Sequence, residues 1–427
     1  MSTTTTEKVK ATLAKRYARE TRFRAYGFIS IALSILFLAI LLLDIFSKGL
    51  PAFTSTYIKL DVVLDAPTLG LEANPTLEQL NAANYSKAID TSLETLFPGV
   101  EERKQKKALK AMISDDAAYT LRDQIVADPS MIGTTQSLWL LADDEIDVFH
   151  KGGVDRALPE SDRRIKDFQL TWLDKLEAED RIESQFNTIF FTRGDSREPE
   201  QAGILSALIG SIYTMLVTLL LSFPIGVAAA IYLEEFAPKN NFWVDLIEVN
   251  INNLAAVPSI VFGLLGLAVF IQFFGTPRSA PLTGGLVMSL LVLPTIIIAS
   301  RAALRSVPPS IREGALGLGA SKTQSVFQNV LPLAMPGIMT GAIIGMAHAL
   351  GETAPLLMIG MVAFIMDVPS GVTSPAAALP VQIFLWSDSP ERAFMERTSA
   401  AIIVLLAFLI LMNLIAVILR KRFERRW

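Results

Sequence analysis

The 427-residue sequence lacks cysteine altogether and has only two histidines, His150 and His348. The absence of cysteine excludes disulfides and thiolate metal sites. A histidine-rich zinc or iron site is not expected either, because the two histidines lie far apart in the chain. Charged residues are scarce, at 19%, whereas an ordinary soluble domain has about 25%. With 51% hydrophobic residues, the composition indicates a membrane protein and excludes a disordered, collagen-like or disulfide-stabilised chain.

Motifs of common catalytic sites are missing as well. The sequence has no G-x-x-x-x-G-K-[ST] segment, so no phosphate-cradling P-loop is encoded. It has neither G-x-S-x-G nor H-E-x-x-H, and no paired catalytic constellation. We therefore predict that the chain is not an enzyme, binds no cofactor or metal, and leaves any ATP hydrolysis to a separate polypeptide. Its basic residues gather at the edges of apolar runs, so nucleic-acid binding is not expected.

The first long apolar run is Gly27–Phe46, which has the length of about 20 residues that a bilayer requires. It is too long for the apolar region of a signal peptide, and no A-x-A cleavage site follows it. We predict an uncleaved first transmembrane helix at residues 27–47, preceded by a cytoplasmic segment at 1–26. The cytoplasmic side follows from the positive-inside rule, because this segment has seven basic residues against Glu7 and Glu20.

Residues 48–202 have the composition of a soluble domain, with 18 Lys/Arg and 28 Asp/Glu and hence a net charge of −10. Helical patterning extends over about Thr76–Ala127 and again over Asp174–Phe186. Between them, Ser137–Val154 has the pattern of a strand, an acidic turn and a second strand. We predict a small α+β extracytoplasmic domain between the first and second spans, called the insertion below.

Five further apolar runs are each long enough to cross a membrane, at about 203–233, 246–274, 282–300, 333–366 and 399–419. Together with the first helix they predict an all-α polytopic membrane protein with six transmembrane helices. The five later spans form a core at 203–419.

The charges of the connecting segments indicate which side each faces. With six spans both termini are cytoplasmic, and so are the loop at 301–331 and the basic tail at 420–427. One segment departs from the rule, because Glu234, Glu235 and Asp245 outnumber Lys239 in the turn at 234–245. Acidic residues contribute little to the rule, so the predicted topology is kept.

The loop at 301–331 contains the most specific motif. It reads REGALGLGA from Arg312 to Ala320, and nine residues separate Ala320 from Val330-Leu331-Pro332. This pattern predicts a short amphipathic helix, a glycine turn, and a second helix that re-enters the membrane. Charged and small residues on such a helix suit docking into a groove of a soluble partner; an ordinary inter-helix loop is the alternative.

The same segment resembles the EAA loop of bacterial ABC-importer permeases, E-A-A-x3-G-x9-I-x-L-P. Gly314 replaces the first alanine, and Asn329 stands where isoleucine is usual. The resemblance implies a permease subunit of the ABC importer type, whose loop couples to an ATPase. The residues implied in this coupling are Arg312, Glu313, Gly314, Ala315, Gly319, Leu331 and Pro332.

Four other stretches narrow the resemblance. Leu350–Leu357 reads LGETAPLL and resembles the signature of the PstA family, permeases of bacterial phosphate importers. Segments beginning at Pro224, Val257 and Leu379 are similar to other parts of this family. The resemblance covers the first helix and about 203–427, but not about 55–200, which is much longer than the usual loop.

Candidate residues of the substrate path come from the same spans. A carboxylate such as Glu352 costs about 2.5–3.5 kcal/mol at the centre of a membrane helix, so it should face a partner or an aqueous cavity. Structural pairing and gating both remain open for Glu352, and His348 lies on the same helix face at the i, i+4 spacing. Arg301 is either a path residue or an anchor at the inner interface. Thr353 and Ser259 complete the set of path or gating candidates.

The family resemblance implies an assembly in the bacterial inner membrane. It consists of a second, PstC-like permease, a PstB-like ATPase dimer that binds ATP and Mg, and an extracytoplasmic phosphate-binding protein. Contacts with membrane lipid and with a phosphate-sensing kinase complex are also implied. The alternatives are a permease for another oxyanion such as molybdate or phosphonate, a mainly signalling subunit, and a stand-alone channel or secondary transporter. The insertion either docks the binding protein or a regulatory partner, or only supports assembly.

Overall fold

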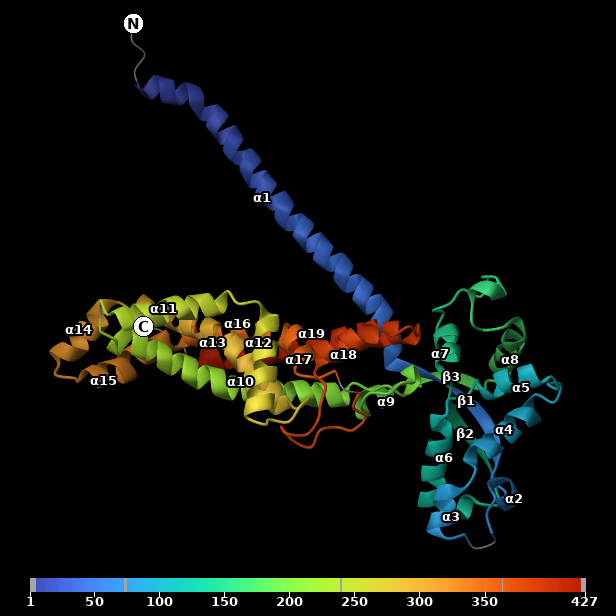
Figure 1. The fold of residues 1–427 in the computed structure, drawn as a ribbon. Helices are drawn as coiled ribbons and strands as arrows, with labels where there is room; N and C mark the ends of the chain where they lie inside the picture. The colour runs from blue at the N-terminus through green and yellow to red at the C-terminus, as the bar shows by residue number, and fades with distance from the viewer. Residues whose placement is uncertain (1–4, 73–74, 239, 363, 424–427) are drawn as a thin grey trace.

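The computed structural model describes residues 5–72, 75–238, 240–362 and 364–423. Figure 1 shows a bundle of long helices and, beside one end of it, a smaller unit of short helices and strands. α1 (Thr5–Gly49) leads into the smaller unit and diverges from the bundle over most of its length. Residues 1–4 of the predicted N-terminal segment, Lys239, and residues 424–427 of the predicted tail lie outside the described residues.

The smaller unit is formed by the insertion and is built around a three-stranded antiparallel sheet in the order β2-β1-β3. β1 (Thr54–Val63) is the central strand, between β2 (Thr135–Leu141) and β3 (Ile182–Phe186). Ile58 of β1 lies opposite Leu140 of β2. The side chains of a strand alternate between the two faces of a sheet, and in β1 Ile58 and every second residue after it are buried.

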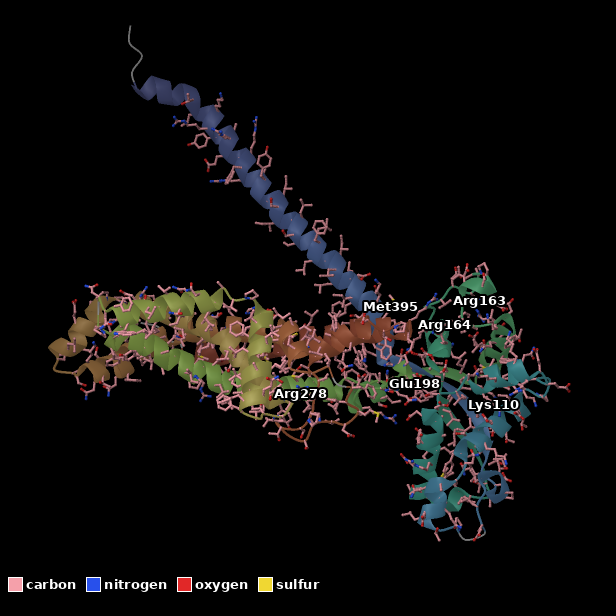
Figure 2. All side chains as sticks on the ribbon, viewed as in Figure 1. Lys110, Arg163, Arg164, Glu198, Arg278 and Met395 are labelled. Atoms are coloured by element: carbon pink, nitrogen blue, oxygen red, sulfur yellow. The ribbon has the colours of Figure 1, made fainter. Side chains whose placement is uncertain are left out.

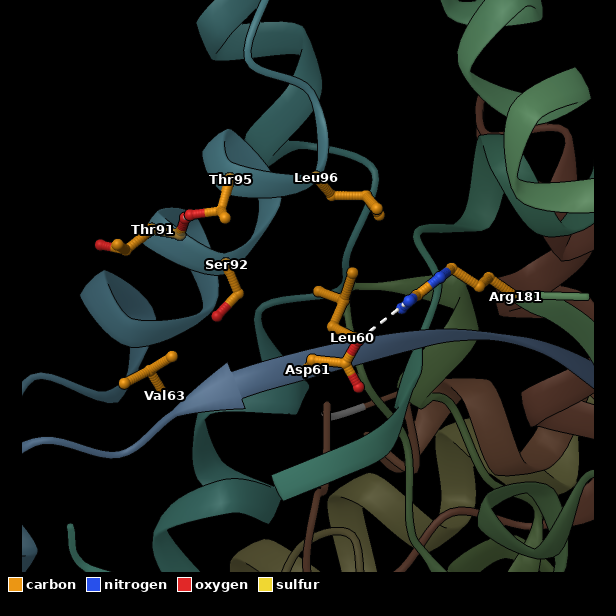
Figure 3. Close-up of a pocket in the computed structure, with 8 residues that line it drawn as sticks. All are labelled: Leu60, Asp61, Val63, Thr91, Ser92, Thr95, Leu96 and Arg181. Carbon is orange, nitrogen blue, oxygen red and sulfur yellow. Dashed lines mark hydrogen bonds and ion pairs between the residues drawn. The ribbon is translucent and has the colours of Figure 1, made fainter. Parts of the chain in front are cut away.

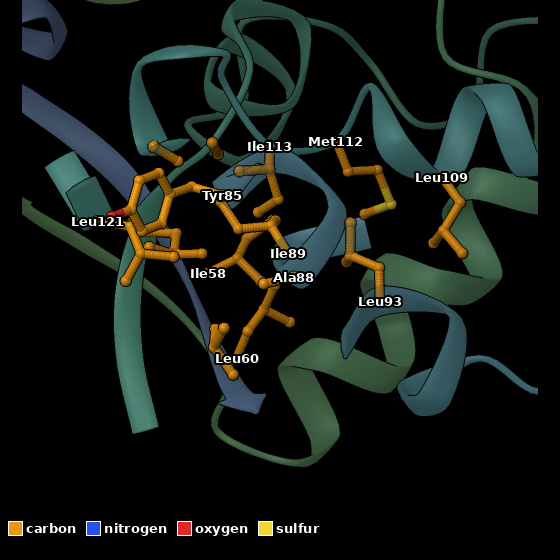
Figure 4. Packing of buried hydrophobic residues seen from close by; sticks show 14 of the residues in the cluster. Ile58, Leu60, Tyr85, Ala88, Ile89, Leu93, Leu109, Met112, Ile113 and Leu121 are labelled. Atoms are coloured by element: carbon orange, nitrogen blue, oxygen red, sulfur yellow. The ribbon is translucent and has the colours of Figure 1, made fainter. Parts of the chain in front are cut away.

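Helices cover one face of this sheet and complete its core (Figure 4). Ile58 and Leu60 of β1 lie in one cluster with Leu93, Leu109 and Leu121 from three helices, and all five are buried. The helices and short turns of the insertion are the 3-10 turn Leu50–Phe53, α2 (Ala66–Leu69), α3 (Leu77–Ala82), α4 (Tyr85–Leu96), α5 (Arg103–Lys110), α6 (Asp116–Ala127), the turn Pro129–Met131, α7 (Asp144–His150), the turn Glu160–Asp162, α8 (Asp167–Ala178), α9 (Thr188–Thr192) and the turn Pro199–Gln201.

Two sequence predictions inside the insertion are wrong in part. The strand predicted in the second half of Ser137–Val154 is helix α7, because the Asp143 carboxylate caps that helix by accepting from the Glu145 amide at 3.2 Å. The helix predicted over Asp174–Phe186 ends at Ala178, and β3 follows. Asp180 has a φ of 52°, which turns the chain out of the helix and into the strand.

Within the described residues, five helices are long and apolar enough to cross a membrane. They include α1, whose apolar stretch is exposed in this chain. The helices of the bundle are α10 (Leu205–Ile231, continued by a π-turn Tyr232–Phe236), α11 (Phe242–Ala255), α12 (Ser259–Leu265, continued as π-helix Gly266–Phe273), α13 (Pro281–Ser306), α14 (Pro309–Gly317), α15 (Lys322–Gln324, continued as π-helix Ser325–Val330), α16 (Leu331–Gly351), α17 (Ala354–Met358), α18 (Leu379–Ser387) and α19 (Ala393–Phe423).

Two predicted spans differ from the structure. The run at 246–274 is a pair of helices, α11 and α12, bent by 105°, because Pro258 begins a new helix and disfavours helical geometry in the residue before it. The run at 333–366 is also interrupted. α16 ends at Gly351, where Glu352 takes extended backbone angles, and only the short α17 follows before the chain becomes irregular.

Glycines let the central helices of the bundle approach closely. A Cβ added to Gly285 of α13 would lie 2.4 Å from the Cβ of Val217 on α10. One added to Gly341 of α16 would lie 2.3 Å from the Cβ of Ala299 on α13. Small residues at such contacts are typical of packed membrane helices. α13 therefore forms the centre of the bundle, between α10 and α16.

Buried contacts fasten the insertion to the bundle. The carbonyl oxygen of Ala52 accepts hydrogen bonds from the Asn187 side chain at 2.9 Å and from Arg397 of α19 at 3.3 Å. The Arg397 guanidinium also lies over the ring of Phe190, which is fully buried. Figure 2 shows Met395 of α19 and Glu198 of the insertion near this joint. The insertion is thus packed against α19 and is not merely tethered by flexible linkers.

Candidate coupling helix and substrate path

The loop that resembles the EAA motif contains the short helix α14, whose limits follow from its sequence. Pro308 occupies the N-cap and Pro309 the first helical position, where a missing amide hydrogen costs nothing. After α14 ends, Gly319 has a φ of +88°, a left-handed conformation that favours glycine. Ser321 then begins the next helix with a capping box formed with Gln324. The predicted order of helix, glycine turn and helix is present.

One face of α14 is free of contacts with the rest of the described chain. Glu313, Gly314 and Leu316 are exposed, and Leu318, just after the helix, is 92% exposed. An exposed leucine next to a carboxylate on a protruding helix suits a binding surface more than a solvated loop. Ala315 is half-buried. Gly319 is exposed, whereas Leu331 and Pro332 are half-buried at the start of α16 and do not belong to the same face.

Arg312 points the other way, into the permease itself. Its Nε and Nη2 donate to the two carboxylate oxygens of Glu235 at 2.6–3.2 Å. Its Nη1 and Nη2 also donate to the carbonyl oxygens of Val307 at 2.8 Å and Leu304 at 2.9 Å. The Glu235 side chain is only 7% exposed. The Arg312 guanidinium is therefore occupied within this chain and does not belong to the exposed face of α14, and its implied part in coupling stays a prediction.

Arg301 is likewise paired inside the bundle. Its Nη2 lies 2.5 Å from Glu248 of α11, and its Nε lies 3.5 Å from Glu234. Glu234 also accepts from Arg305 at 2.9 Å. These contacts explain why an acidic turn occurs where basic residues are usual: its glutamates neutralise arginines at the ends of α13 and α14. Arg301 is only 12% exposed in its side chain, so the structure favours a structural role for it.

His348 and Glu352 meet as their spacing predicts. The His348 Nε2 lies 2.9 Å from the Glu352 carboxylate, with side-chain exposures of 53% and 22%. Glu352 is not in mid-helix, because α16 ends one residue before it. The pair therefore lies at a break in the helix, partly on the outer surface of this chain. Thr353, the N-cap of α17, comes directly after it.

The helix that Ser259 begins lies near this break, whereas Arg301 does not. Ser259 begins α12, and Gly263 of α12 is in close contact with Pro355 of α17. On α16, however, it is Gly337 that packs against α13 near Arg301, at Ala303. His348 is eleven residues further along α16, or about 16 Å at 1.5 Å per residue. The structure thus groups His348, Glu352, Thr353 and the helix of Ser259, and separates Arg301 from them.

A group of buried carboxyls at the joint was not identified from the sequence. Burial, then the neighbouring Asp144 charge, raises the pKa of Asp143 to about 8. Burial, followed by the charge of Glu145, raises the pKa of Asp144 to about 6. The pKa of Glu200 is raised to about 7, mainly by burial, although Ser114 donates to its carboxylate at 2.5 Å. The run ADDE at 142–145 is the sequence signal for Asp143 and Asp144, and its pattern predicts an acidic turn between two strands.

The insertion also has a small pocket, shown in Figure 3, which is remote from the path candidates. Its volume is about 170 Å³, and the ion pair between Asp61 and Arg181, 2.9 Å long, lies in its wall. Hydrogen bonds from Ser137 and Arg181 hold the pKa of Asp61 below its usual value. The hydroxyls of Thr91 and Thr95 donate back to their own helix, so they offer no free donor to a ligand. Among the described residues, no group of three or more His, Cys, Asp or Glu could hold a metal ion.

Comparison with known proteins gives the class of the chain. A family model described as the inner membrane component of binding-protein-dependent transport systems matches residues 222–427. A second model, described as a domain of unknown function (DUF3333), matches residues 10–160 and so includes part of α1 and much of the insertion. The apolar helices and the exposed α14 agree with the first model. They define a multi-pass permease of the inner membrane.

Individual relatives narrow this class. The phosphate transport system permease protein PstA 1 of Mycobacterium tuberculosis (strain CDC 1551 / Oshkosh) is 34% identical over 232 residues, which cover 53% of this chain and 74% of the relative. The chain belongs to the family of ABC-transporter permeases that includes PstA, and the predicted resemblance is confirmed.

Other matches are to a relative covered over a shorter stretch and to solved structures. The probable ABC transporter permease YqgH of Bacillus subtilis is 35% identical over 162 residues, 37% of this chain and 52% of the relative. The chain therefore spans about half the length of that relative. Among solved structures, the inward-facing MetNI methionine ABC transporter matches with a TM-score of 0.42 at 18% identity, over 51% of this chain and 95% of the other.

Proposed function

We propose that the chain is one of two membrane-spanning subunits of an ATP-driven importer of inorganic phosphate. The observation that carries this proposal is the protruding helix α14, exposed on one face at Glu313 and Leu316 and anchored on the other. Its position between two long apolar helices suits a helix that docks on an ATPase. The identity to PstA permeases supports phosphate as the substrate.

The arrangement of the elements supports six spans with both termini in the cytoplasm. The insertion contacts the end of α1 and the beginnings of α10 and α19, whereas α14 lies at the opposite ends of α10 and α13 (Figure 1). If α11 and α12 together count as one bent span, the chain has six. The insertion is then an extracytoplasmic α+β domain, and α14 faces the cytoplasm with the basic N-terminal part of α1.

The remaining parts of the transporter are supplied by partners. A PstC-like permease completes the path, a PstB-like ATPase dimer binds ATP and Mg, and an extracytoplasmic phosphate-binding protein delivers the anion. The apolar surface of α1 remains exposed in this chain, for instance at Phe28 and Phe37, and suits contact with lipid or with the second permease.

The pair of His348 and Glu352 is the proposed gate. A free carboxylate would repel phosphate, so a path that contains one needs a partner for it. His348 supplies that partner at the point where α16 breaks. A shift of α16 that separates the two residues would expose a carboxylate to the anion. Closing the pair would restore a neutral or weakly charged wall, so the contact can change the barrier for phosphate.

The insertion is proposed to dock the binding protein. It has its own hydrophobic core, and its joint to α19 is buried, so it presents a fixed surface beyond the outer ends of the helices. A fixed surface favours docking because little conformational freedom is lost on binding. The alternative is a domain that only supports assembly.

Phosphate uptake tests the proposed function directly. Radiolabelled phosphate at micromolar concentration is offered to proteoliposomes that contain all partners, with wild type, Glu313→Lys and Glu352→Gln compared. We expect both variants to assemble and to lose uptake, by about tenfold or more, because one reverses a charge on the docking face and the other removes the gate's charge.

The outcomes separate the parts of this proposal. Uptake of molybdate or phosphonate in place of phosphate would contradict the substrate but keep the ABC permease. Uptake that persists without the ATPase would contradict ATP-driven import. Leu318→Ala serves as a milder companion to Glu313→Lys, because it trims the same face without changing its charge.

A further inference from the structure

Helix α14 is connected to α10 by a buried charge contact as well as by its own chain. The contact joins Arg312 of α14 to Glu235, which lies in the π-turn that continues α10. Their side chains are 23% and 7% exposed. No residue of α14 is fully buried, but the half-buried Ile311 packs against the cluster that contains Leu304 and Val307. The helix also contacts the segment Ser325–Val330.

The guanidinium of Arg312 joins three elements at once. It forms a two-pronged contact with Glu235, and it also donates to the carbonyl oxygens of Leu304 and Val307 at the end of α13. Last-turn carbonyls lack partners inside their helix and favour a cation. A planar guanidinium offers several donors in fixed directions, which makes such a joint stiff. Removing one member would leave the other buried and unpaired.

We infer that Arg312 and Glu235 form a positioning clamp that transmits movement of α14 to α10. When a partner pulls on the exposed face of α14, the clamp carries the displacement to the end of α10 as well as to α13. α10 runs the length of the bundle, and its beginning lies at the joint with the insertion, so the same movement reaches the opposite side. This inference rests on the proposed function of α14 as the ATPase contact.

The test uses the complete transporter in proteoliposomes and measures ATP hydrolysis and phosphate uptake in the same vesicles. Arg312→Gln keeps the exposed face of α14 intact. We expect the ATPases to remain bound and hydrolysis to stay within about twofold, while uptake falls by about tenfold or more because the helices are misplaced. The ATP consumed per phosphate therefore rises. Glu235→Gln should give the same pattern.

Charge exchange separates a clamp from a merely structural arginine. Arg312→Glu alone places two carboxylates together, and adding Glu235→Arg restores an opposite pair. Uptake in the double variant should exceed that of Arg312→Glu, since contacting residues show coupled effects. It should stay below wild type, because a carboxylate at 312 cannot donate to the carbonyl oxygens of Leu304 and Val307. Arg305→Gln is the matched control, because Arg305 lies nearby but is 60% exposed and pairs with Glu234. Arg305→Gln should change the number of ATP molecules hydrolysed per phosphate imported by less than about twofold.

A second measurement needs no substrate. The chain lacks cysteine, so spin labels can be placed at Ser310→Cys in α14 and Tyr232→Cys at the end of α10 in the assembled transporter. Arg312→Gln should broaden the distribution of distances between the labels. If wild type imports no phosphate, the proposed function is wrong, and this distribution alone decides on the clamp.

Three results would overturn the clamp. The first is a proportional loss of hydrolysis and uptake in Arg312→Gln, or loss of the bound ATPases. The second is a charge exchange without any recovery. The third is a label distance that stays as narrow as in wild type.

Discussion

At the scale of single residues, two glycines of the coupling loop have opposite requirements. Gly314 lies inside α14 with open space around it, and a side chain there would meet no neighbour within 4 Å. Gly319 is equally open but has a φ of +88°. Space is therefore not what distinguishes them; the backbone conformation is. The sequence motif specifies glycine at 319 and alanine at 314, which agrees with this difference.

We expect Gly319→Ala to destabilise the loop and Gly314→Ala to stabilise it. A left-handed conformation costs an L-residue about 1–2 kcal/mol. An alanine in the interior of a helix gains about 0.5–1 kcal/mol over glycine. Hydrogen exchange of the α14 amides should therefore be faster in Gly319→Ala and slower in Gly314→Ala than in wild type. Equal exchange in the two variants would contradict the account of Gly319.

Single residues also show where sequence reasoning succeeded and failed. The contact of His348 with Glu352 was predicted correctly from their spacing, because i and i+4 share a helix face whatever surrounds them. The contact of Arg312 with Glu235 could not be predicted in this way, since the two residues lie 77 positions apart in the sequence. The same holds for Arg301, whose partners lie on α10 and α11.

At the scale of elements, the joint between the insertion and the bundle concentrates buried carboxyls. Asp143 caps α7, and Glu200 lies in the turn before α10 with 4% of its surface exposed. Their ionised forms are penalised by burial, and Glu391, on the segment before α19, contributes a further charge that raises the pKa of Asp144. Lys151 and Arg397 carry positive charges at the same joint. Lys151 forms an ion pair with Asp147 at 2.5 Å, and the Asp147 carboxylate also attracts the buried Arg397.

The joint should lose stability as pH rises. The pKa values of Asp143, Asp144 and Glu200 are raised to about 8, 6 and 7, above the value of about 4 for free carboxyls. Protons are therefore bound more tightly in the folded state, and the stability that they contribute is lost as pH rises from about 4, through the folded pKa values, to about 8. We expect the protection factors of the amides at 200–204, measured by hydrogen exchange, to fall over this range. The opening free energy should decrease by up to about 1.4 kcal/mol per pH unit for each group that titrates.

A neutral substitution tests the origin of this dependence. Glu200→Gln should flatten the pH profile and slow exchange above pH 7. Glu101→Gln, an exposed carboxyl of the same insertion, should leave the profile unchanged. A wild-type profile that is flat from pH 6 to 8 would contradict the assignment.

Whole elements were predicted from the sequence where one periodic pattern decides their structure. The apolar runs identified α1, α10, α13 and α19 because length and hydrophobicity suffice for a membrane helix. The runs at 246–274 and 333–366 were equally apolar, yet their helices break at Pro258 and Glu352. A hydrophobic count does not detect a bend, since the broken segments remain apolar on both sides.

At the scale of the whole molecule, the chain connects two sides of the helical bundle. The insertion packs on α19 and on the beginning of α10, and α14 is held at the far end of α10 and α13. The side chains that make these connections are buried, as Phe190 is at one end and Glu235 at the other. The insertion and α14 are therefore attached to opposite ends of the same central helices.

Removing the insertion should impair transport without preventing assembly of the transporter. We expect a chain with residues 60–195 replaced by a short flexible linker to assemble with the ATPases. Its uptake should fall by about tenfold or more, because a docking surface for the binding protein is lost. Co-purification of the binding protein measures that surface directly. Unchanged phosphate uptake together with unchanged association of the binding protein would contradict docking. Failure of the shortened chain to assemble with the ATPases would also contradict it, and would favour a role of the insertion in assembly.

The sequence by itself determined the membrane class, the separate insertion and the helix, glycine turn and helix of the loop at 301–331, because these depend on local composition, on runs of apolar residues and on a motif of fixed spacing. Tertiary structure decided which charges meet. Glu234, Glu235 and Glu248 neutralise the arginines of α13 and α14, and Asp143 and Glu200 are buried at the joint. These contacts join segments that are distant in sequence, and the burial that shifts a pKa exists only once the helices have packed.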